Sequence, residues 1–261
     1  MKKIIICITI FFMYSLCQAE TYTFGVIPQK KASVLAPKWK LIFNKMSKIT
    51  GHKFVFATRK NIPQYKAAVE NGEFDFIYDN PYHYLKAHTL AGYEAIAHAK
   101  NKKIKGLIVV KKDSLIQNVT HLKGKDLYFP RGAFAADVLP RAMLEQKNIV
   151  ANMFFTTSHE DGYYHVSITP DGVAAGGVFR TLKGSKYKDD LRVLWESKGY
   201  TPHAVAAHPK IPDNIRQGVI KALIDSTEEF KKLKIKEGMV AADDSHYDDL
   251  REIEPFLDKI K

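Results

Sequence analysis

The chain has 261 residues, a formal net charge of +12 at pH 7 and a hydrophobic share of 46%. This length predicts one large domain or two modest ones. The positive charge favours an anionic ligand, but the lysines are scattered along the chain, which argues against nucleic acid as the partner and is equally typical of a solvated surface.

The first 19 residues have the pattern of a secretory signal peptide. Two lysines precede an apolar run, residues 4–16, and the triplet Cys17-Gln18-Ala19 has the small residues of a cleavage site. The apolar run is shorter than the roughly 20 residues that a membrane-spanning helix needs. A lipid anchor at Cys17 is the alternative, but Leu16 stands where a lipoprotein signal has a small residue. We therefore expect export and cleavage after Ala19.

Cleavage at this point removes both cysteines, Cys7 and Cys17, so neither a disulfide nor a thiol contributes to the mature protein. It also lowers the formal charge to +10, because two lysines and no acidic residue leave with the signal. An exported chain without disulfides depends on its own buried core, and about 240 residues are enough to form one.

Strand-like and helix-like segments alternate along the first half of the mature chain. The first helix has apolar residues at spacings of three and four between Leu35 and Ile49, and Gly51 ends it. The predicted strands are 22–27, 53–57 and 74–78, and the predicted helices are 35–50, 62–71 and 81–88.

The second half continues this alternation. The predicted strands are 107–110, 126–129, 153–156, 173–179, 191–195 and 203–207, and the predicted helices follow residue 132 and cover 159–168, 213–226 and the acidic tail 243–258. Such alternation predicts parallel sheets with crossover helices. Ligands of open sheets bind beyond the carboxyl ends of the strands, which directs attention to the positions after Ile27, Tyr78 and Phe129.

The strand end at Tyr78 carries aromatic and polar residues around one turn. Asn80 before Pro81 favours a turn, and the proline suits the first turn of a helix. Together with Tyr78, the residues Tyr82 and Tyr84 offer hydroxyl groups and aromatic walls. These tyrosines either close over a small ligand or pack in the core with satisfied hydroxyls.

The segment FPRGAFAADVLPR (129–141) reads as a helix start without a cap. Helices usually begin with Ser, Thr, Asp or Asn, whose side chain accepts from the free N–H groups. Gly132, Ala133, Phe134 and Ala135 have no side-chain acceptor. Free N–H groups at the positive end of the helix dipole form a site for an anion. These amides therefore either hold a ligand oxygen or are capped by water.

Five ordered segments of the chain resemble the phosphate/phosphite/phosphonate-type substrate-binding proteins of bacterial ABC transporters, and together they span essentially the whole mature chain. They are FGVIPQK (24–30), NGEFDFIYDNPYHY (71–84), KIKGLIVVKKDS (103–114), FPRGAFAADVLPR (129–141) and GYTPHAVAAHP (199–209). The resemblance implies an α/β fold of the type II periplasmic binding protein class. Two lobes, each a mostly parallel sheet flanked by helices, would be joined by two crossover strands and would close on a ligand by a hinge motion.

On this sequence, lobe I would comprise residues 20–109 and 206–261, and lobe II residues 110–205. The crossings would be 107–110 and the stretch around 200–206.

The resemblance also implies which residues meet the ligand. The amides at 132–135 would hold an oxyanion, and Arg180, after the Gly-rich strand, would grip a carboxylate or phosphate unless it is an ordinary surface arginine. His159 would contact the ligand unless Ser158 simply caps the helix there. The expected ligand-binding residues are Gln29, Tyr78, Asn80, Tyr82, Gly132, Ala133, Phe134, Ala135, His159, Arg180 and His203.

Two positions bear on the kind of ligand. Relatives that bind amino-phosphonates carry acidic residues near Phe179 and His203, whereas this chain has an apolar residue and a histidine there. These residues argue against a zwitterionic ligand.

The function implied is that of a periplasmic receptor that captures a small oxyanion and delivers it to an inner-membrane ABC permease, as a monomer and without a cofactor. One alternative is a receptor that signals through a membrane histidine kinase; another is an iron receptor of the same fold, although no H-x-x-x-H or C-x-x-C pair appears. Catalysis is not expected, because the chain has no G-x-S-x-G, H-E-x-x-H or P-loop motif.

Overall fold

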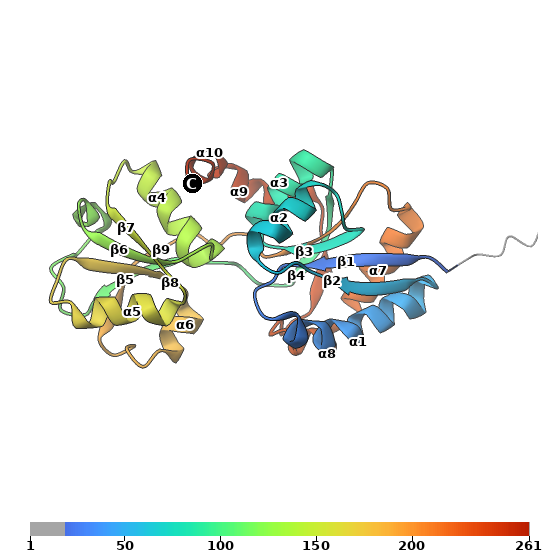
Figure 1. Cartoon of the computed structure of the whole chain (residues 1–261), viewed down its shortest axis with the longest axis horizontal. Helices are drawn as coiled ribbons and strands as arrows, with labels where there is room; N and C mark the ends of the chain where they lie inside the picture. The colour runs from blue at the N-terminus through green and yellow to red at the C-terminus, as the bar shows by residue number, and fades with distance from the viewer. Residues whose placement is uncertain (1–18, 261) are drawn as a thin grey trace, which may run out of the picture.

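The structure is a computed structural model that describes residues 19–260. The predicted signal peptide, residues 1–19, therefore lies outside the described residues except for Ala19. The described chain forms two lobes side by side, each built around its own sheet (Figure 1). No helix within residues 19–260 is long and apolar enough to cross a bilayer.

The first lobe contains a six-stranded mixed sheet with the order β11-β4-β10-β3-β1-β2. Strands β1, β2 and β3 are parallel, whereas β10 runs antiparallel to both of its neighbours and β11 antiparallel to β4. The strands are β1 (Thr21–Val26), β2 (Lys53–Ala57), β3 (Phe76–Asp79), β4 (Glu94–Ala99), β10 (Ala204–Ala207) and β11 (Met239–Ala241).

The second lobe contains a five-stranded mixed sheet with the order β7-β6-β8-β5-β9. Strands β6, β7 and β8 are parallel, and β5 is antiparallel to β8 and β9. The strands are β5 (Leu107–Lys111), β6 (Asp126–Pro130), β7 (Asn152–Thr156), β8 (Val173–Gly177) and β9 (Leu191–Glu196).

Helices cover both faces of each sheet, as the predicted alternation requires (Figure 1). In the first lobe they are α1 (Ala32–Thr50), α2 (Ile62–Glu70), α3 (Pro81–Ala91), α7 (Asp213–Ile224), α8 (Thr227–Lys231), η3 (Asp244–Tyr247), α9 (Asp248–Arg251) and α10 (Glu254–Leu257). In the second lobe they are η1 (Val119–Leu122), η2 (Phe134–Val138), α4 (Leu139–Gln146), α5 (His159–Ile168) and α6 (Phe179–Gly184).

Helix α1 shows how the sequence fixes these elements. Its buried residues, spaced three and four apart, are Leu35, Trp39, Ile42, Phe43 and Met46. Because they lie on one face, the helix packs that face on the sheet and exposes the rest. Gly51 ends it in the left-handed region, with φ of 76°, where a glycine has no Cβ to clash. The predicted end of this helix is confirmed.

The structure differs from the predicted elements at three places. Strands β4 and β11 were not predicted; β4 has the sequence EAIAHA and β11 has only three residues. The predicted strand 173–179 is wrong at its end, because β8 stops at Gly177 and Phe179 opens helix α6. Arg180 therefore lies in the first turn of a helix and not on the end of the strand.

The sheet pairing moves both predicted lobe boundaries. All of β5 pairs within the second sheet and all of β10 pairs within the first, so the boundaries at 109/110 and 205/206 fall inside strands that belong wholly to one lobe. The chain crosses between the lobes earlier, where Ile104 and Tyr200 exchange two backbone hydrogen bonds of 2.8 and 2.9 Å. This short antiparallel bridge joins the two crossing segments.

The C-terminal helices lie between the two lobes, next to α3 and α4 (Figure 1). Lys86 on α3 pairs with Glu254 of α10 at 3.0 Å, and Lys259 beyond α10 pairs with Glu145 of α4 at 3.3 Å. Buried residues of the tail share one apolar cluster with Leu139 of α4. The tail predicted for lobe I therefore also contacts lobe II.

Candidate functional site

A pocket of about 170 Å³ lies between the lobes, beyond the carboxyl ends of β1 and β3. The first lobe contributes most of its wall, and the second lobe contributes Arg180 from α6. The lining residues are Val26, Ile27, Gln29, Lys30, Leu35, Lys38, Trp39, Tyr78, Arg180, Lys232, Leu233 and Lys234. Three residues predicted to meet a ligand, Gln29, Tyr78 and Arg180, are thus brought together.

His203 lies beside this pocket and is held by two of the predicted residues. The amide nitrogen of Gln29 donates to Nε2 of His203 over 2.8 Å. The ring of Tyr78 stacks on the imidazole of His203 with a centroid distance of 5.2 Å. The ring of Tyr78 also lies 5.1 Å, between centroids, from that of Trp39. Because an imidazole nitrogen accepts only when it carries no proton, this contact requires a neutral tautomer.

Burial keeps His203 neutral at physiological pH. Desolvation, assisted by the nearby positive groups Lys102 and His83, lowers the pKa of His203 from 6.5 to about 3. The Gln29–His203 contact is therefore a polar surface that carries no charge of its own, and it can meet an anion without a competing carboxylate.

Arg180 lies close to two other basic side chains. Burial lowers the pKa of His159, and the charge of Arg180 lowers it further. Burial and, after it, the charge of Arg180 also lower the pKa of Lys102. Lys102 lies in the segment that crosses between the lobes and has an exposed side chain. The charge of Arg180 thus disfavours the protonated forms of His159 and Lys102, and a bound anion would offset that repulsion.

The lining of the pocket is strongly basic. Five of the residues are cationic and none is acidic. Within residues 19–260 no carboxylate pairs with any of the five. The five are Lys30, Lys38, Arg180, Lys232 and Lys234. Unneutralised cations around a partly enclosed space favour an anionic occupant.

The helix start at 132–135, predicted to have no cap, is capped by a side chain of the helix itself. The side chain of Asp137 reaches back and accepts from the amide of Gly132 at 2.7 Å, and the amide of Ala133 donates to Pro130 O at 3.1 Å. The prediction that Gly132 and Ala133 offer free amides to a ligand is therefore wrong. Within the described residues, the amides of Phe134 and Ala135 donate to no protein acceptor.

The same segment packs backbone against backbone on the second sheet. A Cβ on Gly176 would lie 1.7 Å from the carbonyl oxygen of Ala136, and one on Gly106 would lie 2.1 Å from that of Ala135. Only glycine allows such an approach. Two glycines therefore fix the position of the predicted anion-binding turn.

Two predicted ligand residues are already engaged within the protein. Asn80 is buried and caps α3, its side-chain oxygen accepting from the amide of His83 at 3.0 Å. Tyr82 donates its hydroxyl to Asp258 at 3.1 Å and so ties α3 to the C-terminal tail. His159 opens α5 and is half-buried, and Ser158 before it is the N-cap, accepting from the amide of Asp161.

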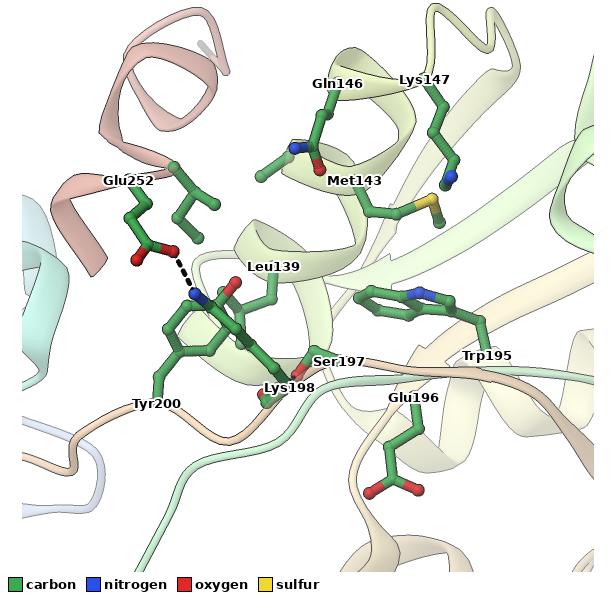
Figure 2. Close-up of a pocket in the computed structure, with 12 residues that line it drawn as sticks. Leu139, Met143, Gln146, Lys147, Trp195, Glu196, Ser197, Lys198, Tyr200 and Glu252 are labelled. Carbon is green, nitrogen blue, oxygen red and sulfur yellow. Dashed lines mark hydrogen bonds and ion pairs between the residues drawn. The ribbon is translucent and has the colours of Figure 1, made fainter. Parts of the chain in front are cut away.

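A second hollow, of about 320 Å³, lies on the hinge side between α4, the end of β9 and the C-terminal tail (Figure 2). Lys198 pairs there with Glu252, and Lys147 and Glu196 also line it. Because its charges are mixed, this hollow has no preference for an anion. None of the predicted ligand residues lines it.

Five basic residues of the site escaped the sequence analysis. Four of these lysines line the pocket, Lys30, Lys38, Lys232 and Lys234, and their runs in the sequence look like any solvated lysine-rich surface. The fifth is Lys102, in the segment that crosses between the lobes. Within residues 19–260, no group of three His, Cys, Asp or Glu side chains could hold a metal ion.

The neutral state of His203 predicts how stability depends on pH. Between about pH 3 and 6.5 the unfolded chain binds a proton at this position and the folded chain does not, so acid favours unfolding by up to about 1.4 kcal/mol per pH unit from this group. We expect His203→Asn to reduce the loss of unfolding free energy between pH 6.5 and 4.5, measured by urea denaturation. Equal losses in both proteins would contradict this assignment.

Comparison with curated proteins and with solved structures shows what this chain is similar to. No curated protein matches the chain in sequence. Among solved structures, a binding protein component of an ABC phosphonate transporter from Pseudomonas aeruginosa is similar, with a TM-score of 0.69 and 16% identity over 92% of this chain and 87% of that one.

Two further structures are similar. PhnD1 from Prochlorococcus marinus, solved with methylphosphonate, has a TM-score of 0.72 and 16% identity, covering 92% of this chain and 99% of that one. A Xanthomonas citri protein bound to chloride ion has a TM-score of 0.75 and 14% identity, covering 92% and 98%. At these identities the likeness shows the fold, and it confirms the predicted two-lobed α/β architecture. The prediction that each sheet is mostly parallel is wrong, because antiparallel pairs are at least as many as parallel ones in both sheets.

The family follows from the sequence itself. Residues 24–247 match the family model described as "ABC transporter, phosphonate, periplasmic substrate-binding protein". Proteins of this kind bind a small ligand for a membrane permease and are not enzymes. The chain therefore belongs to the family of periplasmic substrate-binding proteins of phosphonate ABC transporters.

Proposed function

We propose that this protein captures a small oxyanion of the phosphonate, phosphate or phosphite type in the pocket between its lobes. Arg180 is the main charged contact, and Gln29, Tyr78 and His159 are polar contacts. The observation that carries the proposal is the lining of the pocket, in which Arg180 from one lobe meets Gln29 and Tyr78 from the other without any acidic residue. The solved relative with methylphosphonate supports this ligand class.

The role of the second lobe in binding has two parts. Arg180 supplies a full charge with a planar fork of N–H donors, which matches a phosphoryl group. We infer that the amides of Phe134 and Ala135 add neutral donors when the lobes close. The nearby carbonyl groups of Ala135 and Ala136 pack against Gly106 and Gly176, so these donors are fixed in place before a ligand arrives.

The site also bears on which phosphonates bind. Phe179, beside Arg180, is an exposed apolar residue, and His203 is neutral at physiological pH. A ligand that carries an ammonium group would therefore meet cations and apolar surface but no carboxylate in the pocket lining. We infer that 2-aminoethylphosphonate is a poor ligand.

A thermal-shift panel tests the proposed function. A ligand that binds only the folded protein adds roughly 2.7 kcal/mol of stability at a hundredfold excess over its dissociation constant. We expect methylphosphonate, phosphite or phosphate to raise the melting temperature, and 2-aminoethylphosphonate and small carboxylates to leave it almost unchanged. If no phosphorus oxyanion raises it, the proposed ligand class is wrong.

We further infer that the mature protein begins after Ala19 and is a monomer. Strand β1 starts at Thr21, so cleavage there leaves the first sheet intact. Mass spectrometry of the exported protein tests the cleavage site, and light scattering after size-exclusion chromatography tests the monomer.

A further inference from the structure

The lining of the interlobe pocket holds more positive charge than a single oxyanion needs. We define the lysine pocket as Lys30, Lys38, Lys232 and Lys234, all from the first lobe. Two of them come from the β1–α1 connection and from α1, and two from the turn after α8. They surround the same space as Trp39 and Tyr78, next to Arg180.

The backbone at Lys234 is an independent sign that a side chain is kept at this position in spite of strain. The turn after α8 has the hydrogen bonds of a Schellman motif, from Ile235 N to Phe230 O at 3.0 Å and from Lys234 N to Lys231 O at 2.9 Å. In that motif Lys234 occupies the position that glycine usually fills, and its φ is 63°. A residue with a side chain is strained there, and such strain is typical of functional positions.

Within the described part of the chain, the four lysines of this pocket form no salt bridge, although the charge of Lys232 contributes to the lowered pKa of Glu229. Across residues 19–260, Lys30, Lys38, Lys232 and Lys234 form no ion pair, although Lys231 and Lys45, close by in sequence or on α1, pair with Glu228 and Glu229. Lys38 is half-buried, so its charge has lost part of its water without gaining a carboxylate. This arrangement favours an anion from outside the protein.

We propose that the lysine pocket is a second anion subsite, continuous with the oxyanion site at Arg180, so that the preferred ligand class is a compound with two phosphoryl or phosphonyl groups. This inference rests on the proposed function, because the first of the two groups occupies the proposed oxyanion site. The second group lies among the four lysines, and the aromatic rings of Trp39 and Tyr78 border the link between the groups.

Calorimetric titration with two related probes tests the subsite. We expect methylenediphosphonate to bind at least tenfold more tightly than methylphosphonate. Lys38→Gln should remove most of that tenfold difference, because it weakens methylenediphosphonate binding much more than methylphosphonate binding. The matched control is Lys48→Gln, an exposed lysine ten residues further along α1 and outside the pocket, which should change neither affinity.

Lys234→Gly separates the subsite from general effects on folding. Glycine relieves the backbone strain, so we expect a higher melting temperature of the unliganded protein together with weaker binding of methylenediphosphonate. A variant that is more stable and yet binds less tightly cannot be explained by damage to the fold.

The outcomes distinguish the two proposals. Equal affinity of the two probes, or an unchanged ratio in Lys38→Gln and Lys234→Gly, overturns the subsite and leaves the proposed function standing. Binding of methylenediphosphonate with no binding of methylphosphonate overturns the proposed single-oxyanion function and leaves the lysine pocket as an anion site. Equal weakening in Lys48→Gln shows that only the net charge matters and overturns the subsite as well.

Discussion

Arg180→Gln is expected to weaken binding of the oxyanion on the order of thirtyfold or more. We expect closure of the lobes on the anion to take Arg180, which is exposed without ligand, out of water. Removing one member of a desolvated charge pair costs about 2 kcal/mol at the least, and each 1.4 kcal/mol is a factor of about ten in the dissociation constant. Arg180 is the residue through which the second lobe contributes a full charge to the pocket lining. The measurement is calorimetric titration with the best ligand of the thermal-shift panel.

We expect Arg180→Gln to have little effect on the stability of the unliganded protein. Arg180 is exposed and, within residues 19–260, has no carboxylate partner, so its removal breaks no ion pair. It also removes the charge that lowers the pKa of His159 and Lys102. We therefore expect an unchanged or slightly higher melting temperature without ligand.

Lys188→Gln is the matched control for Arg180→Gln. Lys188 is an exposed cation in the loop that follows α6, and it does not line the pocket. Both substitutions lower the net charge by one, so a difference between them reports position and not total charge. If the two variants bind alike, Arg180 does not contact the ligand.

The sequence predicted the architecture because its strongest signals are local. The apolar spacing of α1 and the Asn-Pro start of α3 each act within one turn, and both elements begin or end close to where they were expected. Strand β4 was missed because EAIAHA mixes polar and apolar residues, and its place in the sheet depends on β10 and β11, which come more than a hundred residues later.

The site was predictable only in part, because its contacts are long-range. Gln29 and His203 are 174 residues apart in sequence and meet over 2.8 Å. The cap of Gly132 by Asp137 was missed because N-caps are expected before a helix, whereas Asp137 reaches back from within it. The lysine pocket was not predicted, because a sequence does not distinguish a lysine that lines a cleft from one that faces water.

Gly176→Ala is expected to be the most destabilising single change among the substitutions considered. Its Cβ would lie 1.7 Å from Ala136 O and 2.8 Å from Cδ1 of Phe129. The first of these atoms belongs to the backbone and the second to a fully buried ring, so neither can move without displacing its element. We expect a loss on the order of 3 kcal/mol in the free energy of unfolding, measured by urea denaturation.

Gly184→Ala supplies the control for this substitution. Gly184 ends α6, and a Cβ there meets no atom within 4 Å, so alanine should be neutral or should stabilise by about 0.5 kcal/mol. Gly177→Ala is expected to fall between the two, because the three atoms nearest its Cβ all belong to the buried side chain of Tyr163, the hydroxyl oxygen lying at 2.3 Å, and none belongs to the backbone.

The order of these three variants tests how the second lobe prepares its part of the site. If Gly176→Ala folds as stably as Gly184→Ala, the backbone of η2 does not rest on β8 and can yield freely. The donors at Phe134 and Ala135 would then not be fixed in advance, and their proposed contribution to binding would fail. If instead Gly176→Ala is strongly destabilised, any folded fraction should bind the oxyanion less tightly than the wild type, because the displaced turn carries those amides with it.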